Sequence, residues 1–580
     1  MWSVSLFLSL TLAVCLPGQL FLANATEFPM AFGDVLPSLL ALAVAGTTVV
    51  AVLLLAVPKG TVRQVGLATV FAIGCLAWVQ SHLPWPYGIA DGHVIDWTAH
   101  WSDALLDTTM WGAGILAAVW WRRGLTHGVA GASLILAAVQ VSALSIQAAE
   151  TPHRWIDDVT FDDSGRFTFS PDRNVIILVL DTFQTDLFQE LLDDDPALIE
   201  RFPGFTYFRN AISGYPTTAA AIPLILSGRY YDNTESFQRF VRTTYRTASL
   251  PQALTVAGFD VYYHNLYFWP SLYADETIAT HVRSKGVLRY DPLARDRAMR
   301  LLAFGAFRYL PQPGKRLVEA RIAGLVAPRQ PAKSEPAAPA LATLQPGPAP
   351  LSEPPLPGDG PFFQQMAHGA ATTSARPAFK YFHLWGLHPP LTHDEALTPL
   401  NAPYTRDNAL QQARGLLRLV DRFISTITKL QIYDRATIAI LGDHGTAFDL
   451  RLVPVDPSSR THPTARPVPT KRVFALPLML FKRPGDRGPM LVSDAAVTLG
   501  DVPRTVMEAL GLTSDFPGTS MFARDILPRR SRRVLFYSPG ALRLSDDFFP
   551  PLREFNVSGF SWLEESWRQT GRVFRPTNAR

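Results

Sequence analysis

The amino-acid sequence predicts an α/β domain preceded by an N-terminal bundle of about five transmembrane helices. Apolar residues make up 48% of the 580 residues, which is high for a purely soluble protein, and long apolar runs are concentrated before residue 150. From about residue 174 onward, short apolar runs alternate with helix-like stretches. That alternation is typical of a sheet covered by helices.

Five stretches of roughly 16–23 mostly apolar residues come close to the ~20 residues that cross a membrane. They are residues 1–23, 36–57, 64–82, 107–122 and 125–148, and the fourth is the shortest. The first stretch has an alternative interpretation as a cleaved signal peptide. It lacks the basic segment that normally precedes such a peptide, so we favour a retained helix.

Loop charges predict the orientation of these helices. The basic residues lie after the second and fourth spans, namely Lys59, Arg63, Arg122 and Arg123. The loops after the first and third spans contain acidic residues but no Lys or Arg. Because basic loops remain in the cytoplasm, we expect a multi-pass protein of the bacterial inner (plasma) membrane whose chain after residue 150 is periplasmic or extracellular.

Composition argues against several other classes of protein. The net charge is only +4, and no basic stripe is interleaved with aromatic residues, so a nucleic-acid partner has little support. Cys15 and Cys75 are the only cysteines, and both lie in apolar stretches. This excludes a disulfide framework and a thiolate zinc site.

The remainder of the chain is expected to contain one large domain. We predict a transmembrane domain at 1–150, a linker at 151–173, an exported α/β domain at 174–540, and a C-terminal segment at 541–580 without an evident role. About a third of residues 328–361 are proline, which predicts an extended surface insertion. Further strands are expected at 258–263, 379–385, 473–481 and 534–537, and helices at 247–257, 409–430 and 502–510.

Polar side chains follow two apolar strands of this domain. Asp181 ends the run 174–180, and Asp443 with His444 ends the run 437–442. Residues at the carboxyl ends of parallel strands converge in one crevice, so these side chains can meet. Two carboxylates and an imidazole suit one divalent cation, although Asp181 could instead cap the following helix.

Thr218 is the candidate nucleophile. It precedes the apolar and apparently helical stretch 219–227, so its hydroxyl is expected near a helix N-terminus that favours anionic esters. A threonine hydroxyl is weakly nucleophilic unless a base or a metal ion promotes its ionisation. Thr217 is the competitor for this role or for contact with the substrate, and capping is the alternative role for either residue.

Four histidines are further candidates. His388, beside two prolines, is suited to act as an acid toward a leaving group. His383 fits a residue of the sheet or core better than a site residue. His462 could contact the substrate, and His393 is a secondary candidate for the site.

The order of these motifs resembles the sulfatase-type domains of the alkaline phosphatase superfamily. The matching segments are 174–182, 218–228, 247–259, 441–445 and 501–511, so that the resemblance spans about 174–525. It implies a sulfatase/alkaline-phosphatase-like α/β sandwich, one divalent metal ion (Mn²⁺, Mg²⁺ or Zn²⁺) held by Asp181, Thr218, Asp443 and His444, and a covalent intermediate on Thr218. Five helices before such a domain are also the layout of lipoteichoic acid synthases and phosphoethanolamine transferases.

Three departures from the family patterns bear on the expected reaction. Sulfatases carry Cys or Ser at the nucleophile position and Arg four residues later, where this chain has Thr218 and Ile222. They also usually carry two adjacent Asp at the first motif, where this chain has Asp181 and Thr182. Phosphoethanolamine transferases carry Glu at that motif and several disulfides. Together these differences favour phosphoryl transfer over sulfate hydrolysis and leave the donor open.

Three functions follow as hypotheses. The first is a membrane-anchored transferase that moves phosphoethanolamine or phosphoglycerol from a phospholipid donor to an envelope glycan or lipid acceptor. The second is a sulfatase-like hydrolase of sulfuric esters or phosphodiesters. The third is a catalytically inactive scaffold for envelope assembly.

Overall fold

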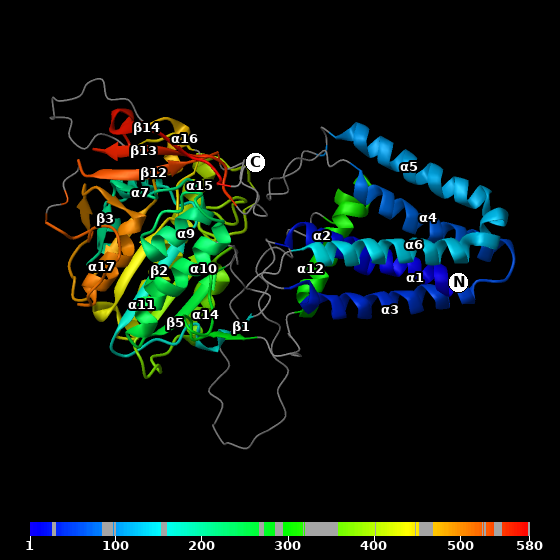
Figure 1. Ribbon diagram of the computed structural model, residues 1–580, viewed down its shortest axis with the longest axis horizontal. Helices are drawn as coiled ribbons and strands as arrows, with labels where there is room; N and C mark the ends of the chain where they lie inside the picture. Colours follow the sequence, from blue (N-terminus) through cyan, green and yellow to red (C-terminus); the bar gives the residue numbers. More distant parts are fainter. Residues whose placement is uncertain are drawn as a thin grey trace, which may run out of the picture. The chain divides into compact units, whose positions relative to one another are not determined.

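The computed structural model describes residues 1–25, 31–83, 97, 100–151, 159–265, 272–284, 294–316, 318, 358–400, 402–446, 448–451, 468–524, 526, 529–538 and 548–577. It divides into two compact units (Figure 1). The helical unit comprises Met1–Asp158 and Lys285–Arg329, and the sheet unit comprises Val159–Ser284 and Gln330–Arg580. The described residues 294–316 and 318 therefore cluster with the N-terminal helices, whereas the predicted boundaries left them inside the α/β domain.

The helical unit is built from long apolar helices. A continuous first helix consists of α1 (Trp2–Leu10), a π-helical turn (Thr11–Cys15) and α2 (Leu16–Ala23). The others are α3 (Phe32–Ala56), α4 (Thr61–His82), α5 (Trp101–Trp120), α6 (Arg122–Glu150) and α12 (Ala294–Tyr309). Gln80 near the end of α4 donates to Asp107 near the start of α5, so these two helices run antiparallel side by side.

Within the described residues, helix length and composition confirm four of the five predicted membrane spans. Trp2–Ala23, Phe32–Ala56, Thr61–His82 and His127–Glu150 are long and apolar enough to cross a membrane. The predicted fourth span forms helix α5, which is long enough but not among these four. Asp103 and Asp107 lie in its first two turns, and charged residues weigh heavily against insertion. The four helices fit membrane anchoring.

The sheet unit has a mixed seven-stranded sheet as its core, which confirms the predicted α/β class. The strand order is β10-β3-β9-β8-β2-β7-β5. The bounds are β2 (Asn174–Leu180), β3 (Thr206–Phe208), β5 (Asp260–Asn265), β7 (Ala378–Leu384), β8 (Thr437–Leu441), β9 (Met479–Lys482) and β10 (Leu491–Ser493). Strands β5, β7, β2 and β8 are parallel neighbours, whereas β9 is antiparallel to β8 and β3.

Helices cover the sheet, as expected for strands whose side chains are buried throughout (Figure 1). Alternate residues of β2 (Ile176, Leu178 and Leu180) belong to one apolar cluster with α7 (Thr185–Asp194), α14 (Gly360–Gly369) and α15 (Arg406–Lys429). A second group of helices packs together around α9: α9 (Thr218–Ser227), α10 (Phe237–Thr247), α11 (Leu250–Val256) and α17 (Val502–Ala509). The remaining short helices are α8 (Leu198–Arg201) and α16 (Thr470–Val473).

Three small sheets complete the described part of the unit. They pair β1 (Val159–Phe161) with β6 (Val282–Ser284), β4 (Ala211–Ile212) with β11 (Val497–Thr498), and β12 (Ser531–Phe536) with β13 (Leu552–Ser558) and β14 (Trp567–Phe574). The C-terminal segment thus supplies two strands. The strand expected at 473–481 is shorter than predicted: α16 ends at Val473 and β9 begins only after Pro477, which lacks the amide a strand interior needs.

Candidate metal centre and active site

Three neighbouring parallel strands deliver the charged side chains to one edge of the sheet. Asp181 directly follows β2, Asp443 lies two residues beyond β8, and His383 is the sixth residue of β7, in register with Val179. Strand β2 lies between β8 and β7. Parallel pairing therefore brings the three side chains together, as expected at the carboxyl edge of such a sheet.

Asp181, His383 and Asp443 form a buried cluster. Each offers one ligand atom, and these atoms lie within 4.8 Å of one another. His383 Nε2 is 3.4 Å from Asp181 Oδ2, and the side chains are 0% and 2% exposed. His444 joins from the turn after β8: its Nε2 is 3.8 Å from Asp181 Oδ1 and 3.6 Å from Asp443 Oδ2.

The distances around His444 fit a shared cation. Ligand atoms of a tetrahedral site with bonds of about 2.0–2.2 Å lie about 3.3–3.6 Å apart. From His444 Nε2, the oxygens of Thr218, Asp443 and Asp181 are at 3.3, 3.6 and 3.8 Å. Asp181 Oδ1 and Asp443 Oδ2 are buried without a hydrogen-bond partner, which is costly for carboxylate oxygens unless a ligand satisfies them.

The imidazole of His444 is oriented as a metal-binding histidine would be. Its Nδ1–H donates to the carbonyl of Gly445 at 2.6 Å, which leaves the lone pair on Nε2 facing the oxygens of the cluster. Asp443 Oδ1 accepts from the amides of Thr182 and His444 at 3.0 and 2.9 Å. One carboxylate oxygen is thus held by the backbone, while the other points toward the cluster.

Backbone conformation at the cluster is restricted. Thr182 has φ 57°, a left-handed value that costs a β-branched residue of the order of 1–3 kcal/mol. Gly386 also has positive φ (59°), and a Cβ there would lie 2.4 Å from the amide nitrogen of Asp181. Only glycine permits this approach, so the loop after β7 closes tightly over Asp181.

Thr218 and Thr217 differ in their partners. Both are half-buried at the start of α9, with Thr217 as N-cap and Thr218 as first helical residue. The Thr217 hydroxyl hydrogen-bonds the phenol of Tyr537, just after β12, whereas the Thr218 hydroxyl lies 3.3 Å from His444 Nε2. The geometry therefore brings Thr218, rather than Thr217, to the cluster.

The N-terminus of α9 adds backbone donors beside Thr218. The first intrahelical bond of α9 runs from the amide of Ala221 to the carbonyl of Thr217. The amides of residues 218–220 therefore have no partner within the helix, and together with the helix dipole they favour an anionic group. Ile222 is fully buried in the apolar body of α9, so the position where sulfatases carry Arg is not available to a substrate anion.

A buried carboxylate holds the loop that carries His388. Asp359 accepts from the amides of Trp385 and Gly386 at 2.8 and 2.9 Å. Burial raises the pKa of Asp359 to about 6, against the stabilising effect of these two amides. His388 Nδ1–H donates to the carbonyl of Pro389 at 2.7 Å, which orients its ring.

Electrostatics favour an ionised Asp181. Burial opposes its charge, but His388, His383 and His444 together lower the pKa of this carboxyl below its ordinary value. Burial likewise opposes a charged His383, whereas Asp181, Asp443 and Asp359 raise the pKa of its imidazole. The site therefore concentrates negative charge on buried carboxylates that imidazoles surround.

The expected site residues thus have different placements. Asp181, Thr218, Asp443 and His444 lie together. The amide of Leu387, one residue before His388, donates to the carbonyl of Asp181 at 2.8 Å, so His388 follows directly in the same loop. His462 lies outside the described residues. His383 is a buried residue of the sheet, as expected, and its ring also belongs to the charged cluster, which was not expected. Its place opposite Val179 in the sheet is what a single sequence could not supply.

His393 takes no part in the cluster. Its Nδ1 contacts the Thr392 hydroxyl at 2.9 Å. Burial lowers the pKa of its imidazole to about 4, with Asp394 acting in the opposite direction. A neutral histidine at this place supports loop packing.

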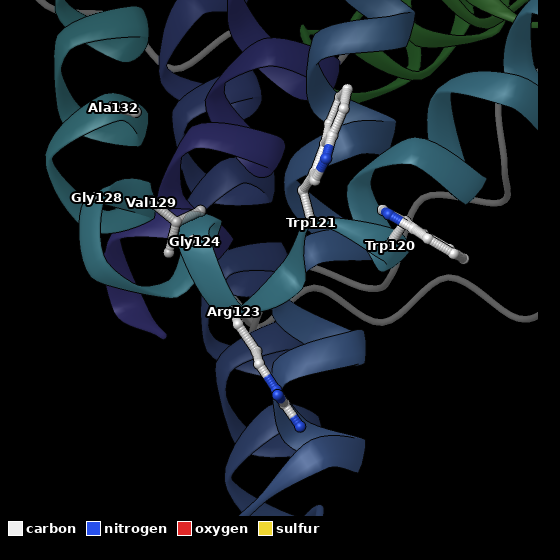
Figure 2. Close-up of a pocket in the computed structure, with 7 residues that line it drawn as sticks. All are labelled: Trp120, Trp121, Arg123, Gly124, Gly128, Val129 and Ala132. Carbon is white, nitrogen blue, oxygen red and sulfur yellow. The ribbon is translucent and has the colours of Figure 1, made fainter.

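A cavity of about 650 Å³ lies in the helical unit, apart from the charged cluster (Figure 2). It is formed where α5 turns into α6, and its walls come from Trp120, Trp121, Arg123 and small residues of α6. Within the described part of the chain, this cavity contains no group suited to metal binding or nucleophilic attack. The chemistry is therefore assigned to the sheet unit.

One family match covers a segment of the chain that lies mainly in the sheet unit. Residues 173–291 match the sulfatase family (Sulfatase), and no curated protein matches the chain. Structural neighbours include the lipoteichoic acid synthase LtaP from Listeria monocytogenes, with 12% identity, TM-score 0.34, and coverage of 71% of this chain and 90% of that chain. A protein in the alkaline phosphatase superfamily from Vibrio parahaemolyticus has 12% identity, TM-score 0.37, and coverage of 70% and 84%.

A third neighbour is the C-terminal periplasmic domain of phosphoethanolamine transferase EptC from Campylobacter jejuni. It has 10% identity, TM-score 0.30, and coverage of 60% of this chain and 92% of that chain. The sulfatase match begins one residue before β2 and includes both Asp181 and Thr218. The segment that is similar to the sulfatase family therefore carries one candidate metal ligand and the candidate nucleophile.

Proposed function

We propose that this membrane-anchored enzyme, whose sheet unit contains a sulfatase domain, transfers a phospho-substituent from a phospholipid to an envelope glycan or lipid through Thr218. The observation that carries the proposal is the placement of the Thr218 hydroxyl 3.3 Å from His444 Nε2, beside two buried carboxylate oxygens without hydrogen-bond partners. A hydroxyl at the edge of a charged cluster is positioned as a nucleophile.

The first half-reaction exchanges one phosphoester for another. Thr218 Oγ1 forms a bond to the phosphorus of the donor headgroup as the bond from phosphorus to the diacylglycerol oxygen breaks. Solvent water takes the hydroxyl proton of Thr218, and the leaving alkoxide gains a proton from the protonated imidazole of His388, which is the proposed acid. The products are diacylglycerol and a phosphodiester on Thr218, so atoms and charge balance.

The second half-reaction reverses these roles. An acceptor hydroxyl attacks the same phosphorus, and neutral His388 removes the proton of that hydroxyl. The bond from phosphorus to Thr218 Oγ1 breaks, and this oxygen takes a proton from solvent water. The free amides at the start of α9 are suited to hold the nonbridging oxygens in both steps.

We assign a divalent cation to Asp181, Asp443, His444 and Thr218, with His383 beside Asp181 as a further ligand or a support for that carboxylate. When bound, it would polarise the phosphoryl oxygens and favour the ionised hydroxyl. Oxygen ligands with imidazole suit Mn²⁺, Mg²⁺ or Zn²⁺. The side chains of this chain position the nucleophile and orient the acid.

Phosphoryl transfer is favoured over sulfate hydrolysis by two residues. Thr218 carries a methyl group that a formylglycine precursor cannot have, and buried Ile222 replaces the arginine that a sulfatase requires. Attachment to apolar helices also suits a donor that stays in the bilayer. It keeps the enzyme at the surface where that lipid is found.

Mass spectrometry of a trapped adduct tests the proposal. The full-length protein would be incubated in nanodiscs with headgroup-labelled phosphatidylethanolamine or phosphatidylglycerol, then cleaved with trypsin. Residues 210–229 form one peptide that contains both threonines, and fragmentation separates them. We expect a phosphoethanolamine or phosphoglycerol mass on Thr218, retained in T217A and absent in T218A. A label on Thr217 would contradict the assignment.

The same experiment separates the other two hypotheses. Labelled free headgroup, with acceptor present and no labelled glycan or lipid, would identify a hydrolase. Absence of any adduct, together with full complementation of a deletion strain by T218A, would identify a scaffold.

We also propose that the sheet unit lies outside the cytoplasm. Loop charges support a cytoplasmic N-terminus, and α5 must then cross the membrane in addition to the four more apolar helices. Protease added to intact spheroplasts is expected to digest the sheet unit. Protection of that unit, with digestion only after lysis, would mean that α5 does not cross.

A further inference from the structure

Helix α12 belongs to the helical unit, although the chain on either side of it belongs to the sheet unit. The sheet unit ends at Ser284 and resumes at Gln330, and α12 lies in between. The helix packs against α2, α3 and α4 (Figure 1). The 16 residues of α12 therefore lie against the N-terminal bundle.

One face of α12 is fitted closely to that bundle. Ala298, Leu301 and Tyr309 are buried, at 0, 2 and 8% exposure. Gly305 lies on the same face, and a Cβ there would be 3.3 Å from Cγ of Pro17. Small residues at close contacts are typical of helices packed in membranes, so this face of α12 is a built interface.

Polar contacts hold the C-terminal end of α12 to the ends of two bundle helices. Arg308 donates to the carbonyls of Ser81 and Leu83, where α4 ends and its last carbonyls have no partner within the helix. Three residues beyond α12, the amide of Gln312 donates to Asp107 Oδ2 at 3.1 Å. The helix is therefore attached to the ends of α4 and α5 that loop charges assign to the outer side of the membrane.

The flanks of α12 expose large apolar side chains. Met299 is 47% and Phe304 is 38% exposed. At 100° per residue, the two lie roughly 100–115° to either side of the buried face, and Arg300 lies opposite that face. Phe307 packs edge-on against Trp97, at 6.2 Å between ring centroids. Aromatic residues of this kind are typical of the boundary between lipid and water.

We propose that α12 is a lipid-interface helix, lying in the headgroup region of the outer leaflet with Met299 and Phe304 among the acyl chains. Its partner is the phospholipid surface itself. The argument rests on continuity: the buried face of α12 is packed on helices that are apolar enough to cross the membrane, so its flanks share their surroundings. The proposal holds whether the enzyme transfers or hydrolyses its substrate.

Spin labels at single cysteines test this placement. Cys15 and Cys75 would be replaced by Ala, and labels introduced as M299C and F304C in full-length protein in liposomes of phosphatidylethanolamine and phosphatidylglycerol. L53C on α3, where Leu53 is 61% exposed, serves as the lipid reference, and R568C on β14 serves as the water reference. Collision rates with oxygen, which concentrates in lipid, and with a water-soluble nickel chelate would be compared.

We expect the oxygen-to-nickel ratio at residues 299 and 304 to exceed that at Arg568 by on the order of tenfold, and to approach that at Leu53. Nickel-accessible labels at both sites would overturn the proposal, because they would place α12 in water. Labels shielded from both reagents would also overturn it, because protein would then cover these residues, either a second copy or the sheet unit.

A photocrosslinker in place of Phe304 gives a second measurement that does not depend on the cysteine variants. A phospholipid adduct on the α12 peptide is the expected product. Crosslinks only to protein would contradict a lipid partner. Because neither readout involves turnover, a failure of the transferase assignment leaves the outcome unaffected.

Discussion

The helical unit exposes large apolar side chains, whereas the sheet unit buries a group of charged ones. Leu116 and Trp120 of α5 are 71 and 81% exposed, and Leu53 of α3 is 61% exposed. In the sheet unit Asp181 and Asp443 are 1 and 0% exposed. Both patterns depart from the ordinary rule of apolar inside and charged outside. Exposed apolar side chains fit contact with lipid in the first unit, and buried carboxylates fit a site that could hold a cation in the second.

Buried polar groups in the two units make the contrast sharper. In the helical unit, Asp107 Oδ2 accepts from Gln80 and from the amide of Gln312, so its burial is compensated within the protein. In the sheet unit, Asp181 Oδ1 and Asp443 Oδ2 accept no hydrogen bond. A satisfied buried carboxylate joins helices, whereas an unsatisfied one indicates a ligand. Variants at the two kinds of carboxylate should therefore fail in different ways.

Asp443→Asn should have the largest effect. The amide keeps one oxygen for the backbone donors of Thr182 and His444, but it removes the charge that would hold the cation. We expect loss of bound metal and a fall in kcat of at least about 10³-fold. Metal content by mass spectrometry and turnover of a labelled phospholipid would be measured on the same sample.

Asp434→Asn is the matched control for this prediction. Asp434 pairs with Arg487 at an exposed site of the same unit, so this variant should keep both metal and activity. If D443N retained stoichiometric metal and normal turnover, the charged cluster would not be the metal centre.

Asp359→Ala should lower kcat without removing the metal. Asp359 fixes the amides of Trp385 and Gly386 and so the loop that carries His388, but it does not belong to the cluster of ligand atoms. A displacement of about 1 Å in such a group costs on the order of 10²-fold, so we expect kcat to fall about 10–100-fold while metal content stays constant.

Asp394 offers a matched control, because it also accepts from two loop amides, those of Ala396 and Thr398, but at an exposed turn. D394A should leave kcat within about twofold. Equal losses in the two variants would mean that Asp359 acts only through general stability.

The sequence predicted the site residues at the ends of strands better than the site residue inside a strand. Asp181, Asp443 and His444 could be recognised because they interrupt apolar runs, and parallel strands bring their ends to one edge. His383 could not, because a histidine inside a buried strand has the same pattern as a residue of the core. Its role depends on pairing with β2 in the register that places it opposite Val179.

Two further features depend on long-range contacts. Asp359 follows a proline-rich stretch. Its role in holding the loop is visible only in its hydrogen bonds to the amides of Trp385 and Gly386, which lie 26 and 27 positions later in the sequence. The sequence likewise assigned α12 to the α/β domain, because packing against α2, α3 and α4 leaves no local signal. The prediction of a membrane span at α5 gave more weight to the length of the apolar stretch than to its charged residues. The carboxylate of Asp107 can be buried in that helix because the side chain of Gln80 and the backbone amide of Gln312 donate hydrogen bonds to it.

Asp107→Leu tests whether the satisfied carboxylate joins the helical unit. The variant leaves the amides of Gln80 and Gln312 without their acceptor, so we expect a loss of about 1–3 kcal/mol in stability and little change in kcat for the folded fraction. Thermal unfolding in detergent would be compared with that of D103L. Asp103 lies one turn earlier and pairs with His100 at a more exposed place, so its removal should cost less than about 1 kcal/mol. Equal destabilisation would contradict the proposed difference.

Lys380→Met should have the smallest effect of these variants. It should increase the stability of the sheet unit near pH 7, whereas the other variants should lower activity or stability. Lys380 is a buried residue of β7 whose ammonium group donates to the carbonyl of Gly165 at 2.6 Å. Burial lowers the pKa of this amine from 10.5 to about 7, with Asp260 acting in the opposite direction. The unfolded chain therefore holds a proton between these pH values that the folded chain lacks, and stability must fall as the pH drops from 10.5 toward 7.

Methionine has no proton to bind, so K380M should remove this slope and stabilise the sheet unit near pH 7 by up to about 1 kcal/mol, after loss of the bond to Gly165. The exposed Lys429 at the end of α15 provides the control, since K429M should leave the pH dependence unchanged. Scanning calorimetry at pH 7 and at pH 9 measures both variants. If K380M destabilised the unit equally at both pH values, Lys380 would be a compensated buried charge like Asp107, and the contrast between the two units would be confined to the metal centre.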